Sequence, residues 1–335
     1  GRFLLHQAPP FQSSRLSVLF PPGYPIVLAI GMLLGSPMLV GPVLAFLIVI
    51  LSDRLAMALT DREDIARIAV VISTFCASLR YHTADTMSHG LCALVLGASV
   101  LFGLRALRSS PEKSFRSWLL SGAFLGLLVA TRPFSGLALG CVGLAALIFR
   151  RVSPKVVLLL ALGAIPPILL LVLHHHAATG QWFKSAQSAY YLASDGPPGC
   201  FRYGFGKGIG CLVEHGSYVD SVLPQGFGFY AALLTTFRRL RQHLVDLANF
   251  EPLALLAIVG IWIGRHSRRI WFASAVPAAL VLAYVPFYFD GSYPGGGARF
   301  FVDSLPFAHV VMALPLADWS LSFANRQKGL AVAIG

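Results

Sequence analysis

Two arginines lie next to apolar runs, where burying a charged side chain is costly unless the charge has a function. Arg132 lies in LLVATRPFSG, between two apolar runs, and Pro133 ends the first of them. Arg299 follows SYPGGG and opens the run ARFFVDSLPF, where a cation opposes the helix dipole. Guanidinium forks suit phosphate, so both residues are candidate ligands for an anion. Two simpler roles stay open: Arg132 as a side chain snorkelling to the interface, and Arg299 in a local pair with Asp303.

A second polar group is RYHTADTMSHG, which places His82, Asp85 and His89 close together. On a helix these three side chains share one face. They could bind a metal ion or form a polar cluster on a cavity wall. The stretch holds no HExxH-type motif, so we predict no metal ligands but leave a divalent cofactor open. In a later loop, His215 is a further candidate ligand for an anion.

The stretch FPPGYP, residues 20–25, precedes the first long apolar run. Each proline fixes φ and pushes the preceding residue out of the helical region. We therefore expect a stiff, non-helical elbow there, with Tyr24 on it.

The composition indicates the kind of structure that carries these residues. The chain has 335 residues, of which 56% are hydrophobic and 12% charged, about half the charge of a soluble domain. Apolar runs recur along its whole length, which predicts an all-α, polytopic integral membrane protein with a single domain over 1–335. We expect about nine spanning segments, near 38–52, 65–80, 87–104, 117–130, 135–149, 156–173, 251–264, 270–289 and 299–317.

Basic loops orient these segments. The net charge is +12, and much of it lies in four stretches, 105–116, 150–155, 265–269 and 326–328. All four fall on one side if TRPF (131–134) is a hairpin tip and 174–250 is one long external loop, which the positive-inside rule favours. The opposite, non-cytoplasmic face then holds 1–37, 80–90, 131–134, 174–250 and 290–298. Nothing in this pattern indicates nucleic-acid binding.

Within the long loop, residues 228–250 have apolar positions at helical spacing and a basic middle. We interpret them as an amphipathic helix on the membrane surface. The alternative is another spanning helix, with Arg238, Arg239 and Arg241 at bilayer depth. Cys200 and Cys211 both lie in the external loop, and we predict a disulfide between them.

Four blocks of the chain together resemble a known family. They are FPPGYPIVLAIGMLLGSPMLVGPVLAFL, TADTMSHGLCALVLGASVLFGLRAL, WLLSGAFLGLLVATRPFSGLALG and GGGARFFVDSLPFAHVVMALPLA. Their content and order resemble bacterial GT-C-fold glycosyltransferases, the group that contains protein O-mannosyltransferases and lipid A aminoarabinose transferases. The resemblance covers most of residues 15–320. The chain departs from it at Gly90, where relatives often have proline, and at Gly41, where asparagine is common.

The resemblance implies an inverting enzyme of the bacterial inner membrane. It would move a sugar from a polyprenyl-phosphate carrier to a glycan, lipid or protein acceptor on the non-cytoplasmic face. Arg132 and Arg299 would hold the carrier phosphate, while Tyr24, Asp85, His89 and His215 would line the cavity. The family's catalytic carboxylate precedes the region matching Gly1, so we expect an N-terminally truncated fragment. A lipid or small-anion transporter and a non-catalytic membrane protein remain alternatives, although no inverted repeat is visible.

Overall fold

The computed structural model describes residues 20–189, 202–293 and 297–334. These residues form helices and three isolated bridges, with no named strand among them, which confirms the predicted all-α class. The helices are α1 (Gly23–Leu33), η1 (Pro37–Leu39), α2 (Val40–Thr60), α3 (Glu63–Phe75), α4 (Ala77–Ala84), α5 (His89–Arg108), α6 (Pro111–Thr131), α7 (Pro133–Phe149), α8 (Pro154–Thr179), α10 (Leu212–Val222), α11 (Phe229–Ala248), η2 (Glu251–Ala254), α12 (Leu255–Ile263), α13 (Arg268–Tyr284), η3 (Arg299–Ser304) and α14 (Leu305–Ile334).

Fewer helices than predicted meet the length and composition of a membrane span among the described residues. Five described segments are long and apolar enough to cross a bilayer: 37–60, 89–108, 114–131, 154–179 and 299–320. A sixth arises if α11 and the helix after it, which meet at 93°, form one broken span. The expected span at 65–80 is divided at Cys76, and α7 and α13 have 17 residues each, short of the roughly 20 that a bilayer needs. The prediction of about nine spans is therefore not confirmed.

Two elements differ from their predicted boundaries. Helix α1 already begins at Gly23, so Tyr24 and Pro25 lie in its first turn, where proline is tolerated. The expected non-helical elbow is therefore shorter than FPPGYP. At the other end, residues 326–328 continue α14 instead of forming a basic loop.

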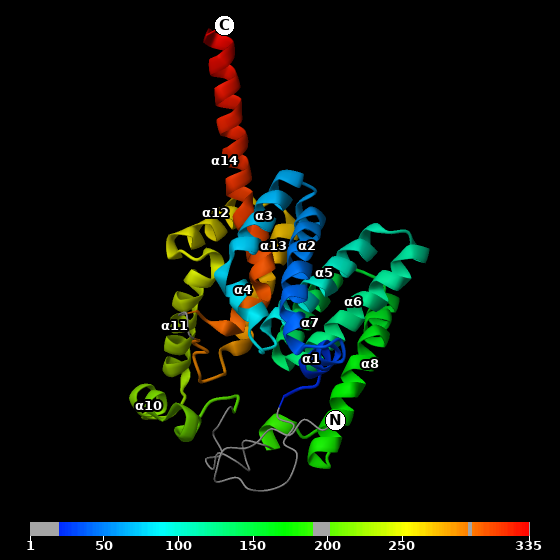
Figure 1. Ribbon diagram of the computed structural model, residues 1–335, viewed down its shortest axis with the longest axis vertical. Coiled ribbons are helices and arrows are strands. Elements are labelled where there is room, and N and C mark those ends of the chain that lie inside the picture. Colours follow the sequence, from blue (N-terminus) through cyan, green and yellow to red (C-terminus); the bar gives the residue numbers. More distant parts are fainter. Residues whose placement is uncertain (1–19, 190–201, 294–296, 335) are drawn as a thin grey trace.

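Helix α5 and the segment 299–320, which includes the first part of α14, are the most buried of the candidate spans (Figure 1). Of the most apolar part of each segment, 67% is buried for 89–108 and 89% for 299–320, against 17% for α8. In Figure 1, α10 and the end of α8 lie at the lower end, while α14 projects from the upper end. His89, at the start of α5, and Asp303, in η3 just before α14, therefore belong to these well-packed segments.

Helices α6 and α8 pack through glycines. A Cβ added to Gly122 would lie 2.1 Å from the carbonyl oxygen of Leu160, and one added to Gly163 would lie 2.1 Å from that of Leu119. Gly126 faces Ala164 in the same way and completes a G-x-x-x-G pattern with Gly122. Small residues let membrane helices approach closely, because apolar lipid gives them little other reason to associate.

We expect Gly122→Val to destabilise the protein by about 1–3 kcal/mol, because the new side chain meets backbone that cannot move aside. Thermal unfolding in detergent would measure this. Gly143→Ala is the control, since a Cβ at Gly143 meets nothing within 4 Å. Equal unfolding temperatures for the two variants would show that α6 and α8 do not depend on this close contact.

Helix α11 has a polar face that points into the bundle. Arg239, His243 and Asp246 are buried, whereas Phe237 and Leu240 are exposed. The helical spacing is as predicted, but its polar side faces the bundle. An apolar outer face is what lipid favours, so the pattern fits a helix embedded in a bilayer.

Candidate functional site

Asp303 is the centre of a buried polar cluster. It lies in η3, is fully buried and accepts hydrogen bonds from Arg132 Nη1 at 3.0 Å and Ser135 Oγ at 2.7 Å. The Nδ1 atom of His89, at the start of α5, lies 3.4 Å from the same carboxylate. Three helices therefore converge on one acidic side chain.

Arg132 occupies the break between α6 and α7. Its backbone is extended, because Pro133 starts the next helix, and its side chain is 11% exposed. Besides Asp303, it contacts His89 Nδ1 and donates to the Tyr284 hydroxyl at 2.7 Å. The snorkelling alternative does not fit this position. Arg132 is held inside the bundle by a carboxylate, as a buried charge requires.

Three arginines surround the ring of Phe300. The guanidinium carbons of Arg132, Arg239 and Arg299 lie 5.8, 5.7 and 5.6 Å from its centroid. Cations attract the faces of aromatic rings, but three of them repel one another across such a short space. This concentration of positive charge is what an anion-binding site provides.

Arg299 and His215 meet at a second ring, that of Phe289. Arg299 lies 5.7 Å from the Phe289 centroid, and the His215 ring stacks on Phe289 with centroids 3.9 Å apart. His215 Nδ1 also lies 3.0 Å from the Tyr288 hydroxyl. Partial burial lowers the pKa of His215, and the charge of Arg299 lowers it further while Asp290 opposes this. At neutral pH the His215 ring is therefore uncharged and able to donate one hydrogen bond.

The turn between α4 and α5 carries the remaining predicted residues. His82 Nδ1 lies 3.0 Å from Asp85 Oδ2, and the His82 and His89 rings have centroids 4.8 Å apart. Burial acts to raise the pKa of Asp85, but its bonds to His82 and to the Met87 N–H hold that pKa below its usual value. Tyr24 is buried, and its hydroxyl donates to the Asp85 carbonyl at 3.4 Å.

All six predicted site residues thus lie along one connected series of contacts. It runs from Tyr24 through Asp85 and His82 to His89, then to Arg132 and Asp303. Phe300 and Phe289 extend the series to Arg299 and His215. Their roles in binding stay predictions, because the arrangement alone does not show a ligand.

The alternative of a metal triad gains no support from the geometry. In the described residues, no group of three or more His, Cys, Asp or Glu side chains is placed to hold a metal ion. Cys211 is buried, but Cys200 lies outside the described residues, so the disulfide between them stays a prediction.

Sequence reasoning missed three residues that build the site. Tyr284 and Ser135 orient Arg132 and Asp303, and the fully buried Arg239 donates to the carbonyls of Tyr284, Phe287 and Phe289. The signal for Arg239 was present, since it repeats the buried positions of α11 at helical spacing with His243 and Asp246.

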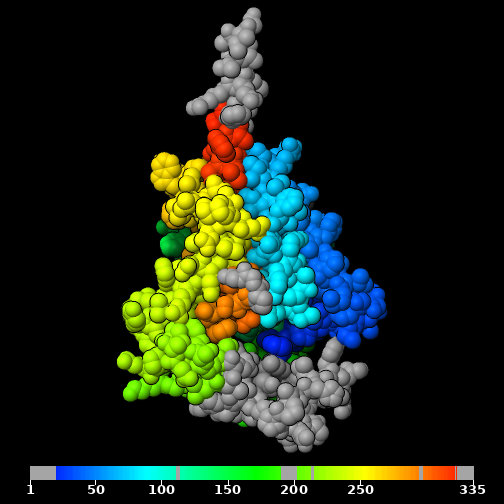
Figure 2. Space-filling model, turned by 60° about the vertical axis from the view of Figure 1, so that its left-hand side comes forward, coloured from blue at the N-terminus to red at the C-terminus, as the bar shows by residue number. Residues whose placement is uncertain are grey.

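A second network fixes the segment that leads to Arg299. Asp246 accepts hydrogen bonds from the Tyr293 hydroxyl at 2.7 Å and the Ala298 N–H at 2.8 Å. Tyr293 also bonds to Ser78 at 3.1 Å, and Figure 2 shows the segment before η3 (orange) lying between α11 (yellow-green) and α4 (cyan). Tyr293 and Ala298, which precede Arg299 in the chain, are therefore held by hydrogen bonds to both α4 and α11.

Comparison with protein-family models and with curated protein sequences gives no match. Among solved structures, the chain is similar to ArnT from Cupriavidus metallidurans in the apo state, with a TM-score of 0.53 and 15% identity over 94% of this chain and 52% of ArnT. A weaker likeness, with a TM-score of 0.49 and 11% identity, is to the apo form of the Archaeoglobus fulgidus oligosaccharyltransferase, over 94% of this chain and 44% of that one. The chain spans about half the length of these two proteins.

The fold is accordingly the GT-C fold, as the sequence resemblance implied. Its apolar helices and this likeness make the chain an integral membrane protein. At 15% identity the likeness defines the architecture alone. Activity must be argued from the site.

Proposed function

We propose that the chain is part of a membrane glycosyltransferase that moves a sugar from a polyprenyl-phosphate carrier to an acceptor. The reaction would take place on the membrane face opposite the basic loops, in the bacterial inner membrane. The observation that carries the proposal is the gathering of Arg132, Arg239 and Arg299 around Phe300. A phosphate on a lipid carrier would meet this positive charge without leaving the membrane.

The three arginines would have different tasks. Arg239 is fully buried, and the Arg132 side chain is held inside the bundle beside Asp303. Arg299 is only partly buried, and it lies beside His215. We therefore assign direct contact with the phosphate to Arg299 and His215, while Arg132 adds its charge from within the bundle.

We give no described residue the role of catalytic base. Asp303 is fully buried in an ion pair, and Asp85 is held ionised by two hydrogen-bond donors that occupy its oxygens. A base must reach the proton that it removes, and neither carboxylate is placed to do so. A carboxylate from elsewhere in the enzyme would supply this step.

Binding of undecaprenyl phosphate tests the phosphate site without requiring turnover. We expect Arg299→Gln to weaken binding by about tenfold or more, because one charge-assisted hydrogen bond to phosphate is lost. Native mass spectrometry of the detergent-purified protein would measure the bound fraction. Arg265→Gln removes the same charge from an exposed position on a basic loop and should leave binding unchanged. Equal losses in both variants would mean that the lipid responds only to net charge.

A further inference from the structure

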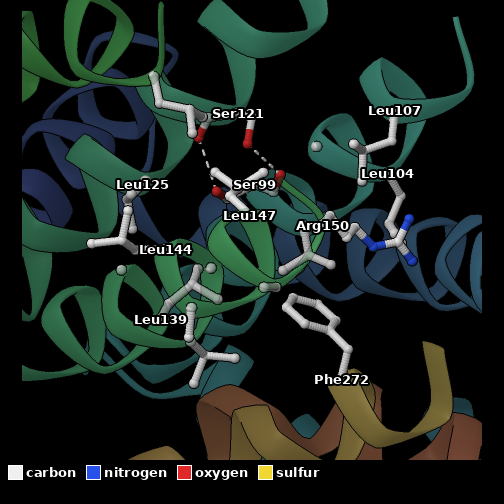
Figure 3. Close-up of a pocket in the computed structure, with 18 of the residues that line it drawn as sticks. Ser99, Leu104, Leu107, Ser121, Leu125, Leu139, Leu144, Leu147, Arg150 and Phe272 are labelled. Atoms are coloured by element: carbon white, nitrogen blue, oxygen red, sulfur yellow. Dashed lines mark hydrogen bonds between the residues drawn. The ribbon is translucent and has the colours of Figure 1, made fainter. Parts of the chain in front are cut away.

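A large cavity lies away from the candidate site, between α5, α6, α7, α8 and α13 (Figure 3). Its volume is about 920 Å³, near the top of the range of about 300–1,000 Å³ in which small ligands bind. It is lined by the later parts of α5 and α7 and the first parts of α6, α8 and α13. These are the helix ends next to the basic connections. His89 and Arg132 belong to the opposite ends of the same helices.

Most of the cavity wall is apolar. Leucine, valine, alanine and aromatic side chains supply most of the lining. Ser99 and Ser121 use their hydroxyls on each other, because each donates to the other's carbonyl oxygen, at 2.9 and 2.8 Å. These two serine hydroxyls are therefore satisfied without water or a polar ligand.

Two glycines keep the cavity open. A Cβ added to Gly140 or Gly143 of α7 would meet nothing within 4 Å. This differs from Gly122 and Gly163, whose missing side chains let two helices touch. The glycines of α7 therefore leave free space along one wall of the cavity.

The charged residues of the lining all have one sign. They are Arg150, at the end of α7, and Arg268 and Arg269, in the first turn of α13. Arg269 pairs with Asp61, whereas Arg150 and Arg268 are exposed. Cations in the first turn oppose the helix dipole, so an anion between α7 and α13 would remove an unfavourable interaction.

We propose that this cavity binds an anionic glycerophospholipid of the leaflet next to the basic loops. Its hydrocarbon chains would fill the apolar chamber, and its phosphate would pair with Arg150 and Arg268. Basic pockets between membrane helices bind anionic headgroups in this way. Inorganic phosphate would leave the chamber empty, and the lipid-linked donor belongs to the opposite face of the bundle.

Native mass spectrometry with two matched lipids tests this. The detergent-purified protein is titrated with phosphatidylglycerol and with phosphatidylcholine of the same acyl chains. We expect phosphatidylglycerol to bind at least about tenfold more tightly, through its charge-assisted contacts. The double variant Arg150→Gln/Arg268→Gln should lose this preference. Its control, Arg105→Gln/Arg265→Gln, removes two exposed charges from the same face outside the cavity and should keep it.

A cavity-filling variant tests the contribution of the apolar cavity to lipid binding separately from that of the arginines. Gly143→Phe should reduce binding of both lipids while circular dichroism and the unfolding temperature stay near wild type, because the new ring enters open space. Equal affinity for the two lipids, or full binding by a folded Gly143→Phe protein, would overturn the proposal. Displacement of bound phosphatidylglycerol by equimolar undecaprenyl phosphate would overturn the identity of the occupant, as would a dimer that forms only when the cavity is empty.

Discussion

Replacing Asp303 with asparagine is expected to destabilise the folded protein by about 3–5 kcal/mol, which is the usual effect of removing one partner of a buried ion pair. The carboxylate is fully buried and is shared by Arg132, Ser135 and His89. After the substitution, Arg132 keeps its charge inside the bundle without a counter-ion. Unfolding of the purified protein in detergent, followed by circular dichroism, would measure the loss.

A partly exposed ion pair is the matched control. Asp318 pairs with Arg62 near the surface, so Asp318→Asn should change stability by only about 0–1 kcal/mol. The double variant Arg132→Met/Asp303→Leu should recover much of the stability, because no unpaired charge remains. Similar losses for Asp303→Asn and Asp318→Asn would refute the assignment of Asp303 as the centre of the buried cluster.

Arg239→Met is expected to cost at least about 3 kcal/mol, because three backbone carbonyls lose their donor at once. These carbonyls belong to Tyr284, Phe287 and Phe289, where α13 ends and the chain turns toward the candidate site. Arg239 therefore closes the end of α13 as well as adding charge beside Phe300. A fall in unfolding temperature and weaker binding of undecaprenyl phosphate should appear together.

Arg241 provides the comparison within the same helix. It is exposed, and Arg241→Met should leave both the unfolding temperature and lipid binding near wild type. Arg239→Lys should restore only part of the loss, because one ammonium cannot match the fork that reaches three carbonyls. An Arg239→Met protein as stable as Arg241→Met would contradict the role that we give to this buried arginine.

The sequence predicted the polar residues of the site better than their partners. Arg132 was recognisable because Pro133 forces a helix to break beside it, which frees space for a functional side chain. The local pair of Arg299 with Asp303 was a reasonable alternative on an α-helix. However, residues 299–304 form a 3₁₀-helix, in which side chains four positions apart point in different directions. Asp303 therefore points inward to Arg132. The local sequence does not predict that this segment is a 3₁₀-helix rather than an α-helix.

The helical periodicity of α11 was also visible in the sequence, but the sequence did not show which side of the helix faces the bundle. In water the apolar side of such a helix faces the protein, whereas in lipid it faces outward, and spacing is the same in both cases. Only the packing of Arg239, His243 and Asp246 against the bundle decides between them. The predicted number of spans is not confirmed for a related reason, because composition marks apolar runs but does not show that α3 ends at Phe75 or that α11 and α12 are bent apart.

The most direct test of the proposed function is to follow the carrier lipid during sugar transfer. Membranes from cells that express the gene encoding this chain would be incubated with undecaprenyl-phosphate-linked sugars, and free undecaprenyl phosphate would be quantified by mass spectrometry alongside glycosylated product. We expect free carrier to appear in proportion to product, and both to fall together in the Arg299→Gln variant. Movement of the intact sugar-linked lipid across the membrane without release of free carrier would contradict the transferase and indicate a transporter.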